Sequence, residues 1–285
     1  MIAAIYIILC IIWGTTWLGI KLGLQDAPPV WAAALRMLLA ALIIFIYNYI
    51  RKNKYPAGIK NLIRVAWPGI LMYAGSYTMV YIGNQFVSSQ IASILFSTYV
   101  FCVILMVPFV VKTEKVTIWS IVGAIIGFAG IVVIFNGPIS LNRDSLIGAV
   151  LFLIAVNCSA YATVHIKAFL KDEPIFPMLA LQMALGGILM LGVALVMEDF
   201  SSFQFTAVSI GSILYLSIFG SVVCFGGYYW LLQRMDAIKV SLIAFITPIV
   251  ALLAGFIVLD ERLTTVDFIG AALVLSGVLI VNIKK

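Results

Sequence analysis

The sequence predicts an all-α membrane protein with ten transmembrane helices, arranged as two inverted five-helix repeats. The first observation is composition: 64% of the 285 residues are hydrophobic and only 10% are charged, with a mean hydropathy of +1.20. A soluble domain carries about 25% charged residues. The second observation is a series of ten apolar runs, each long enough to cross about 30 Å of hydrocarbon. The third is a repeat, because the second half of the chain reproduces residue spacings of the first half.

The ten apolar runs are separated by short connections that carry turn residues, such as Asp26-Ala27-Pro28-Pro29. Backbone polar groups must be paired within the hydrocarbon, and the runs show no alternating strand pattern, so each is expected to be a helix. The first run has no basic segment before it and no cleavage site after it, which favours a membrane helix over a signal peptide. The expected spans are Ile2 to Ile20, Val30 to Ile50, Val65 to Val87, Ile91 to Val111, Val116 to Phe135, Leu146 to Ile166, Ile175 to Met197, Ala207 to Gln233, Val240 to Leu259 and Phe268 to Ile283.

The basic residues predict the orientation of the chain. With the N-terminus on the cytoplasmic side, thirteen Lys and Arg residues fall in cytoplasmic segments and three in outer ones, and Arg36 lies inside a span. Membrane proteins retain basic loops on the cytoplasmic side. We therefore expect a multi-pass protein of the cytoplasmic (inner) membrane with both termini in the cytoplasm.

The two halves of the chain match at a shift of about 146 residues. This shift pairs Lys21 with Lys167 and places Gln182 opposite Arg36. Because each half contains an odd number of spans, the second half enters the membrane from the opposite side. We expect repeat 1 at residues 1–136 and repeat 2 at residues 146–285. Inverted repeats of this kind build alternating access in many secondary transporters, around a site near the bilayer midplane.

Several short motifs resemble the EamA domain of the drug/metabolite transporter superfamily. The first copy differs from the second where it has Tyr99-Val100 or Phe101 in place of Pro248, and Lys112-Thr113-Glu114 in place of Asp260-Glu261. The resemblance covers nearly the whole chain as two copies, and it implies a ten-helix exporter or permease for amino acids, nucleosides, drugs or other metabolites. The residues that carry it are Trp13-Gly14, Ile20-Lys21, Pro28-Pro29, Leu35-Arg36, Thr247-Pro248, Asp260-Glu261-Arg262-Leu263, Gly270 and Gly277.

Composition argues against several other functions. All eleven Asp and Glu residues lie outside the ten spans, so we expect neither a buried carboxylate proton carrier nor an intramembrane enzyme. The chain has one histidine and four cysteines within apolar runs, and we expect no metal site, no disulfide and no cofactor. The basic residues lie in short loops, which disfavours nucleic-acid binding. The sequence has no Walker A motif, so transport would be driven by a gradient.

Arg36 is the one basic residue deep within an apolar run. Seven residues at 1.5 Å each place it roughly 10 Å below the start of its helix at Pro29. We expect Arg36 to face a cavity and bind an anionic substrate group, with Gln182 at the corresponding depth of the second repeat. The alternative is an arginine that extends its head group toward the interface.

His165 is a candidate for proton coupling, because a histidine can titrate near neutral pH. It shares one helix face with Asn157 and Tyr161 at intervals of four residues, and this face could line a cavity. The alternative is an interfacial histidine at the end of its helix. Asn157 and Tyr161 were expected to bind substrate.

Aromatic residues near the middle of spans are further candidates. Interfacial belts explain tyrosine and tryptophan near a membrane surface but not at mid-span, where the polar atom needs a partner or a wet cavity. Core packing is the alternative for each of them. The expected substrate-binding residues, besides Arg36, Asn157, Tyr161 and Gln182, are Trp13, Thr16, Tyr73, Tyr77, Tyr81, Tyr99 and Tyr228.

Two structural signals complete the sequence reading. Glycines at 123, 127 and 130 match Gly270 and Gly277 and predict close packing of the fifth helix against the tenth. Thr264 and Asp267 predict a capping box at the start of the tenth helix.

The sequence therefore favours a secondary transporter of small molecules, in particular an exporter of amino acids or related metabolites. The alternatives are an organic-anion or nucleotide-sugar exchanger, disfavoured because Arg36 is the only buried basic residue, and a non-transporting membrane receptor. The expected partners are the lipid bilayer and a small-molecule substrate, and a homo-oligomer is left open.

Overall fold

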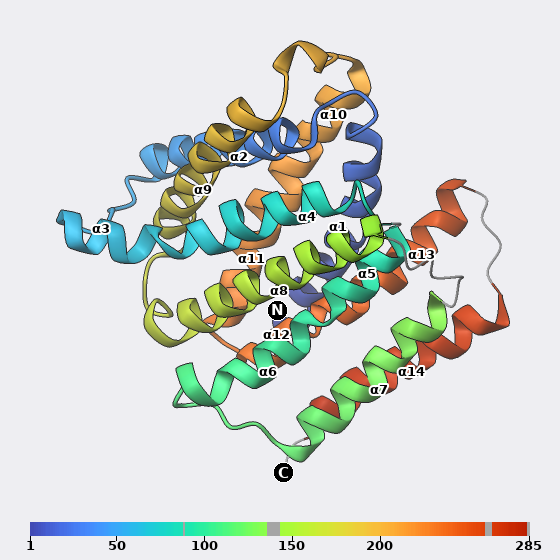
Figure 1. The fold of residues 1–285 in the computed structure, drawn as a ribbon. Coiled ribbons are helices and arrows are strands. Elements are labelled where there is room, and N and C mark those ends of the chain that lie inside the picture. Colours follow the sequence, from blue (N-terminus) through green and yellow to red (C-terminus); the bar gives the residue numbers. More distant parts are fainter. Residues whose placement is uncertain (88, 136–142, 260–263, 284–285) are drawn as a thin grey trace.

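The computed structural model describes residues 1–87, 89–135, 143–259 and 264–283, and all regular structure within these residues is helical. Most of the helices run in one general direction, from lower left to upper right in Figure 1. The first half comprises α1 (Ile2–Gly23), α2 (Pro29–Arg51), α3 (Ile59–Ala66), the π-helix η1 (Ile70–Tyr77), α4 (Thr78–Gly83), α5 (Ser89–Ser97), α6 (Tyr99–Val110) and α7 (Ile118–Ile134).

The second half follows the same plan. It comprises α8 (Arg143–Phe169), α9 (Ile175–Met197), the 3₁₀ turn η2 (Phe200–Ser202), α10 (Ala207–Tyr215), the π-helix η3 (Leu216–Val223), α11 (Cys224–Leu232), α12 (Ala237–Ser241), α13 (Ile243–Leu259) and α14 (Thr265–Val281).

Consecutive elements join end to end, so the described residues form ten rods, five in each half. Seven of these helical segments are long and apolar enough to cross a membrane, and α7 and α14 are shorter apolar helices. The rod count agrees with the ten expected spans, while the length criterion is met by seven. The span predicted from Ile175 to Met197 matches α9. In contrast, α8 extends past its predicted apolar run at both ends, because its terminal polar side chains can reach beyond the hydrocarbon.

The inverted repeat is visible in local backbone irregularities as well as in packing. The π-helices η1 and η3 are each eight residues long and occupy equivalent positions at the 146-residue shift. The α5–α6 rod is interrupted at Thr98 and the equivalent α12–α13 rod at Leu242. π-Helical turns occur frequently at functional sites. Both repeats therefore place irregular backbone in the rods that surround the bundle centre.

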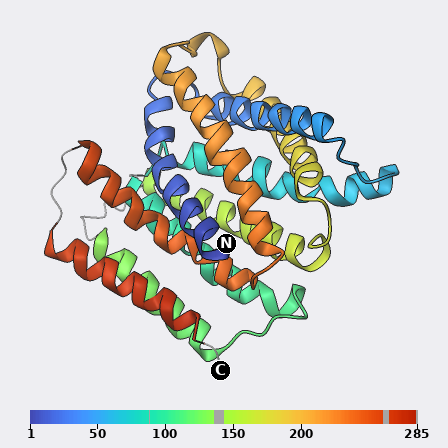
Figure 2. The ribbon, with the colours of Figure 1, turned by 180° about the vertical axis from the view of Figure 1, so that it is seen from behind.

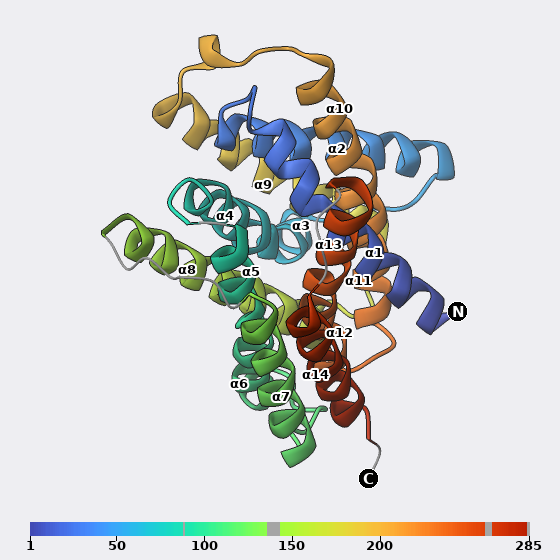
Figure 3. The same ribbon diagram turned by 90° about the vertical axis from the view of Figure 1, so that its right-hand side faces the viewer.

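Equivalent helices of the two repeats pack in pairs. Helix α7 lies along α14, and α2 lies along α9 (Figure 3). The α1–α13 contact has its counterpart in the contact between α8 and α6. Figure 2 shows α1 between the α10–α11 rod and α13. A pseudo-two-fold axis in the membrane plane relates each helix of one repeat to its equivalent in the other, so such contacts occur in matching pairs.

Glycines permit the close approach of α7 and α14, as the sequence predicted. A Cβ atom built on Gly123 would lie 2.5 Å from the Gly277 carbonyl oxygen, and one on Gly130 would lie 2.6 Å from that of Gly270. Side chains at these positions would force the helices apart. The predicted capping box is also present, because the Thr264 side chain accepts from the Asp267 amide and the Asp267 side chain accepts from the Thr264 amide.

Candidate functional site

A cavity of about 120 Å³ lies at the centre of the bundle and is lined by side chains from both repeats. An apolar cavity of roughly 150 Å³ is known to hold benzene, so the space fits a small organic group. The predicted site residues that line it are Trp13, Thr16, Arg36, Tyr77, Tyr99 and Tyr228.

Arg36 is the charged group of this cavity. Its side chain is fully buried; Nε donates to Ser221 Oγ at 2.9 Å and Nη2 donates to the Gly220 carbonyl at 3.2 Å. Nη1 makes a long contact of 3.4 Å with the Tyr81 hydroxyl, and the guanidinium carbon lies 5.1 Å from the ring centre of Tyr77. All of these partners are neutral, and within the described residues Arg36 makes no ion pair. The cavity thus carries a positive charge that the described part of the protein leaves unbalanced.

The π-helix η3 positions this guanidinium. Its Gly220 carbonyl accepts hydrogen bonds from Arg36 and from the Trp13 indole nitrogen, the latter at 3.1 Å. Glycine is needed at this position, because an added Cβ would lie 2.9 Å from the Thr16 methyl group and 3.1 Å from Arg36 Nη2. The irregular backbone of repeat 2 therefore anchors polar side chains from α1 and α2.

Hydroxyl groups form one wall of the cavity. The Tyr99 and Tyr228 hydroxyls are 2.6 Å apart, and the Tyr99 hydroxyl lies 2.7 Å from Thr163 Oγ1. The Trp13 ring packs against Tyr228, with 5.3 Å between ring centres. These contacts join α1, α6, α8 and α11 across the two repeats.

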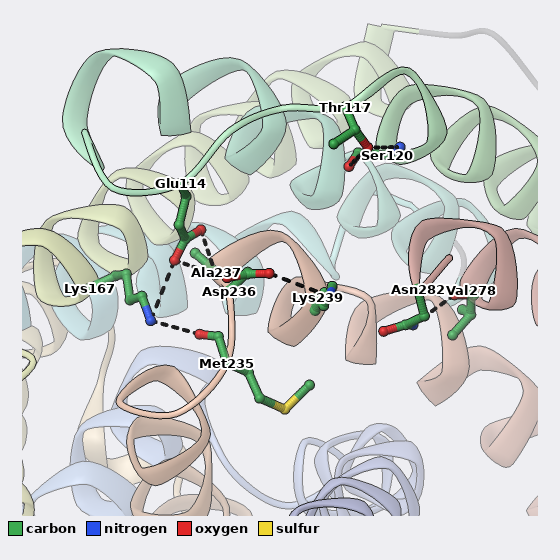
Figure 4. Close-up of polar contacts among 10 residues, drawn as sticks. All are labelled: Glu114, Thr117, Ser120, Lys167, Met235, Asp236, Ala237, Lys239, Val278 and Asn282. Atoms are coloured by element: carbon green, nitrogen blue, oxygen red, sulfur yellow. Dashed lines mark hydrogen bonds and ion pairs between the residues drawn. The ribbon is translucent and has the colours of Figure 1, made fainter. Parts of the chain in front are cut away.

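An ionic cluster closes the end of the bundle at which α8 ends and α12 begins (Figure 4). The Glu114 carboxylate, from the loop between α6 and α7, accepts the Ala237 amide at 2.9 and 3.1 Å and lies 3.4 Å from Lys167 Nζ. Lys167 also donates to the Leu232 and Met235 carbonyls, both at 2.7 Å. A carboxylate of repeat 1 therefore links two segments of repeat 2.

Sequence reasoning missed the role of Glu114, because the residue lies outside every apolar run. The chain folds back so that only 6% of its side chain is exposed. Burial raises the pKa of Glu114, because the charged form loses hydration, and the nearby Asp236 carboxylate adds to this effect. The Ala237 amide and the Lys167 ammonium act in the opposite direction.

Three predicted site residues lie beside the cavity instead of lining it. Gln182 is fully buried, donates to the Val65 carbonyl at 2.8 Å and accepts the Tyr229 hydroxyl at 2.7 Å. The Tyr73 hydroxyl lies 3.2 Å from that of Tyr229. Tyr81 is buried and reaches the cavity only through its contact with Arg36.

The stripe of Asn157, Tyr161 and His165 does not line the cavity, so the expected inward orientation of these residues is corrected. Tyr161 and Asn157 are exposed on the outer surface of α8, and the Asn157 amide donates to the Leu153 carbonyl of its own helix. The His165 ring packs against Trp67, with 4.5 Å between ring centres. The buried face of α8 contains Ser159, and at 100° per residue this face lies nearly opposite the stripe.

Several cavity residues were not among the predicted site residues. Ser76, Ser159, Ser241 and Thr247 could have been noticed as small polar residues in apolar segments, and Trp17 as an aromatic residue within a span, whereas the others lack a sequence signal that separates lining from packing. They are Trp17, Ile20, Met72, Ser76, Val80, Phe96, Ser159, Phe225, Val240, Ser241, Ile243, Ala244 and Thr247.

The profile of the EamA-like transporter family matches the chain twice, over residues 1–136 and 146–283. The chain belongs to this family. Among its relatives, this EamA-like protein is 30% identical to the Bacillus subtilis protein named uncharacterized transporter YvbV, over 97% of this chain and 90% of that protein. It is 27% identical to the uncharacterized transporter YoaV of the same species, over 94% of this chain and 92% of that protein.

A third relative of this EamA-like protein is the uncharacterized inner membrane transporter YedA of Escherichia coli. The two are 28% identical over 97% of this chain and 89% of that protein. A solved crystal structure of another protein superposes with a TM-score of 0.82 at 15% identity, covering 99% of this chain and 96% of that one. At that identity the superposition shows a shared fold. Family and relatives together indicate a multi-pass membrane transporter rather than an enzyme.

Proposed function

We propose that this EamA-like transporter exports small metabolites that carry a carboxylate, such as amino acids or related compounds, by alternating access across the cytoplasmic membrane. The observation that carries the proposal is Arg36, a buried guanidinium in an aromatic-lined cavity with no carboxylate partner among the described residues. A buried cation is tolerated where ligand, water or carbonyl groups solvate it. A substrate carboxylate would complete that solvation through the paired donors of the guanidinium.

The aromatic lining is suited to the remainder of such a substrate. The cavity walls include the rings of Trp13, Trp17 and Phe225. Apolar side chains pack on these rings, and an ammonium group is attracted to their faces. A nucleotide sugar would require several buried cations, so the single Arg36 favours a substrate with one carboxylate over a polyanion.

Alternating access is supported by the closed end of the bundle. The Tyr99–Tyr228–Thr163 contacts and the Glu114–Lys167 cluster connect the two repeats between the cavity and the end where α8 ends. Both structures join the two repeats, so rocking of one repeat against the other would break them. The basic loops predict that this end is cytoplasmic. Export as the direction of net transport rests on the resemblance to family exporters.

A counterflow assay in proteoliposomes tests the substrate proposal. Vesicles loaded with unlabelled compound would be screened with labelled amino acids, nucleosides and cationic drugs. We expect uptake of carboxylate-bearing compounds, and at least about a tenfold higher KM for them in Arg36→Gln, since each lost charged hydrogen bond removes 1.5 to 3 kcal/mol. Arg36→Lys retains the charge but loses the planar fork, so it should also bind these compounds more weakly while sparing cations.

The matched control for charge is Arg143→Gln, which removes an exposed arginine remote from the cavity lining. Its KM should equal that of the unmodified protein. If Arg36→Gln and Arg36→Lys assemble normally and transport carboxylates with unchanged KM, Arg36 is not the substrate-binding group.

Cysteine labelling tests the proposed orientation. Arg143→Cys should react with an impermeant maleimide added outside the cell, and Lys54→Cys and Lys171→Cys only after the inner face is exposed. Reaction of positions 143 and 171 from the same side would contradict the topology.

A further inference from the structure

The N-termini of α2 and α9, the second helices of the two repeats, differ in how their first amides are capped. The first amides of α2 are capped by a carboxylate from the end of α9. Glu198 accepts the Val30 amide at 2.9 and 3.0 Å and the Trp31 amide at 3.0 Å. Such a carboxylate satisfies amides that have no helical partner and neutralises the positive end of the helix dipole. Position 198 therefore supplies an internal anion to α2.

The equivalent carboxylate is missing at the start of α9. The 146-residue shift places Lys52 opposite Glu198 and Phe176 opposite Val30. The N-cap of α9 is Pro174, which has no side-chain hydrogen bond to offer. The chain thus places a cation at the position where the other repeat places its anion.

A positively charged cavity lies at this same place. An open space of about 700 Å³ is lined by Ile175 and Phe176 of α9 and by three basic side chains, Arg51, Lys171 and Arg234. The three come from the end of α2, the α8–α9 connection and the segment after α11. Within the described residues none of the three forms an ion pair. Their charges converge on the uncapped helix end.

The acidic residues of this cavity do not neutralise it. Glu173 is engaged by Arg64, with which it forms an ion pair, and this leaves Asp172 against three cations. Arg234 is held in place, since its guanidinium carbon lies 4.1 Å from the ring centre of Trp230 and its Nη1 donates to the Trp230 carbonyl at 3.2 Å. The cavity is therefore prepared for an anion from outside the chain.

The apolar side of the cavity indicates that this anion belongs to a lipid. Tyr47 lines it and packs on Phe176 with 4.7 Å between ring centres. On the same part of α2, Ile46 and Ile50 are 51% and 69% exposed, as expected for side chains that contact lipid. An acyl chain could follow this surface while its phosphate remained at the helix end. A free phosphate would make no use of the apolar wall.

We propose that the cavity between α2, α9 and α11 binds the phosphate headgroup of an anionic phospholipid, in the leaflet next to the chain termini. The phosphate accepts the Ile175 and Phe176 amides of α9, since Pro177 has no N–H, and shares the cavity with Arg51, Lys171 and Arg234. Basic pockets between helices on the cytoplasmic side are suited to such lipids. The proposal rests on membrane location and does not depend on the identity of the transported substrate.

Lipid retention of the full-length chain tests the proposal. The protein, purified in a neutral detergent, would be incubated with phosphatidylglycerol or phosphatidylcholine and analysed by native mass spectrometry and thermal melting. We expect retention of phosphatidylglycerol and a rise in Tm of a few degrees, as ligand binding to the folded state produces. The double variant Arg51→Gln/Arg234→Gln should lose most of both effects. The control Lys60→Gln/Lys239→Gln removes two charges outside the cavity and should keep them.

A second variant supplies the missing carboxylate. Lys52→Glu puts a carboxylate at the position equivalent to Glu198; because Pro177, the equivalent of Trp31, has no N–H, this carboxylate has one amide fewer to accept, so it should weaken the response to phosphatidylglycerol. Unchanged retention in both Arg51→Gln/Arg234→Gln and Lys52→Glu would overturn the proposal. It would also be overturned by equal retention of phosphatidylcholine, or by an equal Tm rise with inorganic phosphate alone, which would identify a free-anion site.

Discussion

Arg36 and Gln182 occupy equivalent positions in the two repeats, yet their surroundings assign them different tasks. Arg36 lines the central cavity and is held by Ser221 and Gly220 of η3. Gln182 is enclosed between the Val65 carbonyl and the Tyr229 hydroxyl, away from the cavity. Both are fully buried, but the Gln182 amide is paired with two neighbours, whereas the Arg36 guanidinium makes two hydrogen bonds and one long contact with its five N–H groups. The repeat thus supplies two equivalent positions, and local packing places one in the cavity lining and encloses the other among neighbouring polar groups.

The lysines at the ends of α1 and α8 differ in a similar way. Lys167 is bonded to two carbonyls and lies next to Glu114, whereas its equivalent Lys21 is exposed. Glu261, the equivalent of Glu114, lies outside the described residues. The described ion-pair cluster therefore belongs to the end of the bundle at which α8 ends.

The largest expected effect comes from placing an arginine at position 182, the equivalent of Arg36 in the second repeat. Gln182→Arg would bury a guanidinium in a packed site without a cavity or a counter-charge. An uncompensated buried charge destabilises by about 3 to 5 kcal/mol. Thermal melting in detergent should show a large loss for Gln182→Arg and a much smaller one for Arg36→Gln. Equal losses would mean that the two surroundings are not energetically different.

A smaller effect is expected from disturbing the anchor of Arg36. Gly220→Ala introduces a methyl group against Thr16 and Arg36 Nη2. Displacing the guanidinium should raise KM for carboxylate substrates about tenfold, equivalent to 1.4 kcal/mol, with a modest change in Tm. The control is Gly192→Ala, where an added Cβ meets no atom within 4 Å. A normal KM in Gly220→Ala would show that η3 does not position Arg36.

A still smaller effect is expected from titrating Glu114, the ion-pair partner of Lys167. Because burial raises the folded-state pKa of Glu114 above its ordinary 4.5, its contribution to stability is fully present below that value and is lost as the pH rises through the folded pKa. Glu114→Gln removes this titration. The unfolding free energy of the unmodified protein minus that of the variant should fall as the pH rises from ~4 to ~8.

Glu198→Gln controls for the loss of hydrogen bonds to backbone amides. Glu198 lies at the opposite end of the bundle and accepts the Val30 and Trp31 amides. A stability difference that rises with pH in Glu114→Gln would contradict the assigned direction.

The smallest effect is expected on the outer stripe of α8. Asn157→Leu and His165→Phe change residues that do not line the cavity, so KM, and the pH dependence of transport, should remain unchanged. Surface substitutions of this kind usually alter stability by about 0.5 kcal/mol or less. A shifted pH profile in His165→Phe would restore His165 as a proton-coupling group.

The sequence by itself determined the number of helical rods and one of their pairings. Backbone N–H and C=O groups within lipid must be paired inside their own segment, so apolar runs form helices. The apolar runs therefore locate the rods, and one of them has the same limits as α9. Gly123 and Gly277 predicted the α7–α14 contact, because a glycine face has few uses other than close packing. Arg36 was predicted as a cavity residue because a charge at that depth must be solvated.

Only the tertiary structure decided which helix faces point inward. In α8 both Ser159 and Asn157 are compatible with an apolar helix, and contacts with other rods selected the face containing Ser159. Glu114 is buried because its loop folds onto the start of α12, a long-range contact that local hydropathy does not encode. Gln182 and Arg36 look alike as equivalents in the repeat. They diverge because hydrogen bonding depends on the neighbours that folding brings within 3 Å, and those neighbours differ between the two halves.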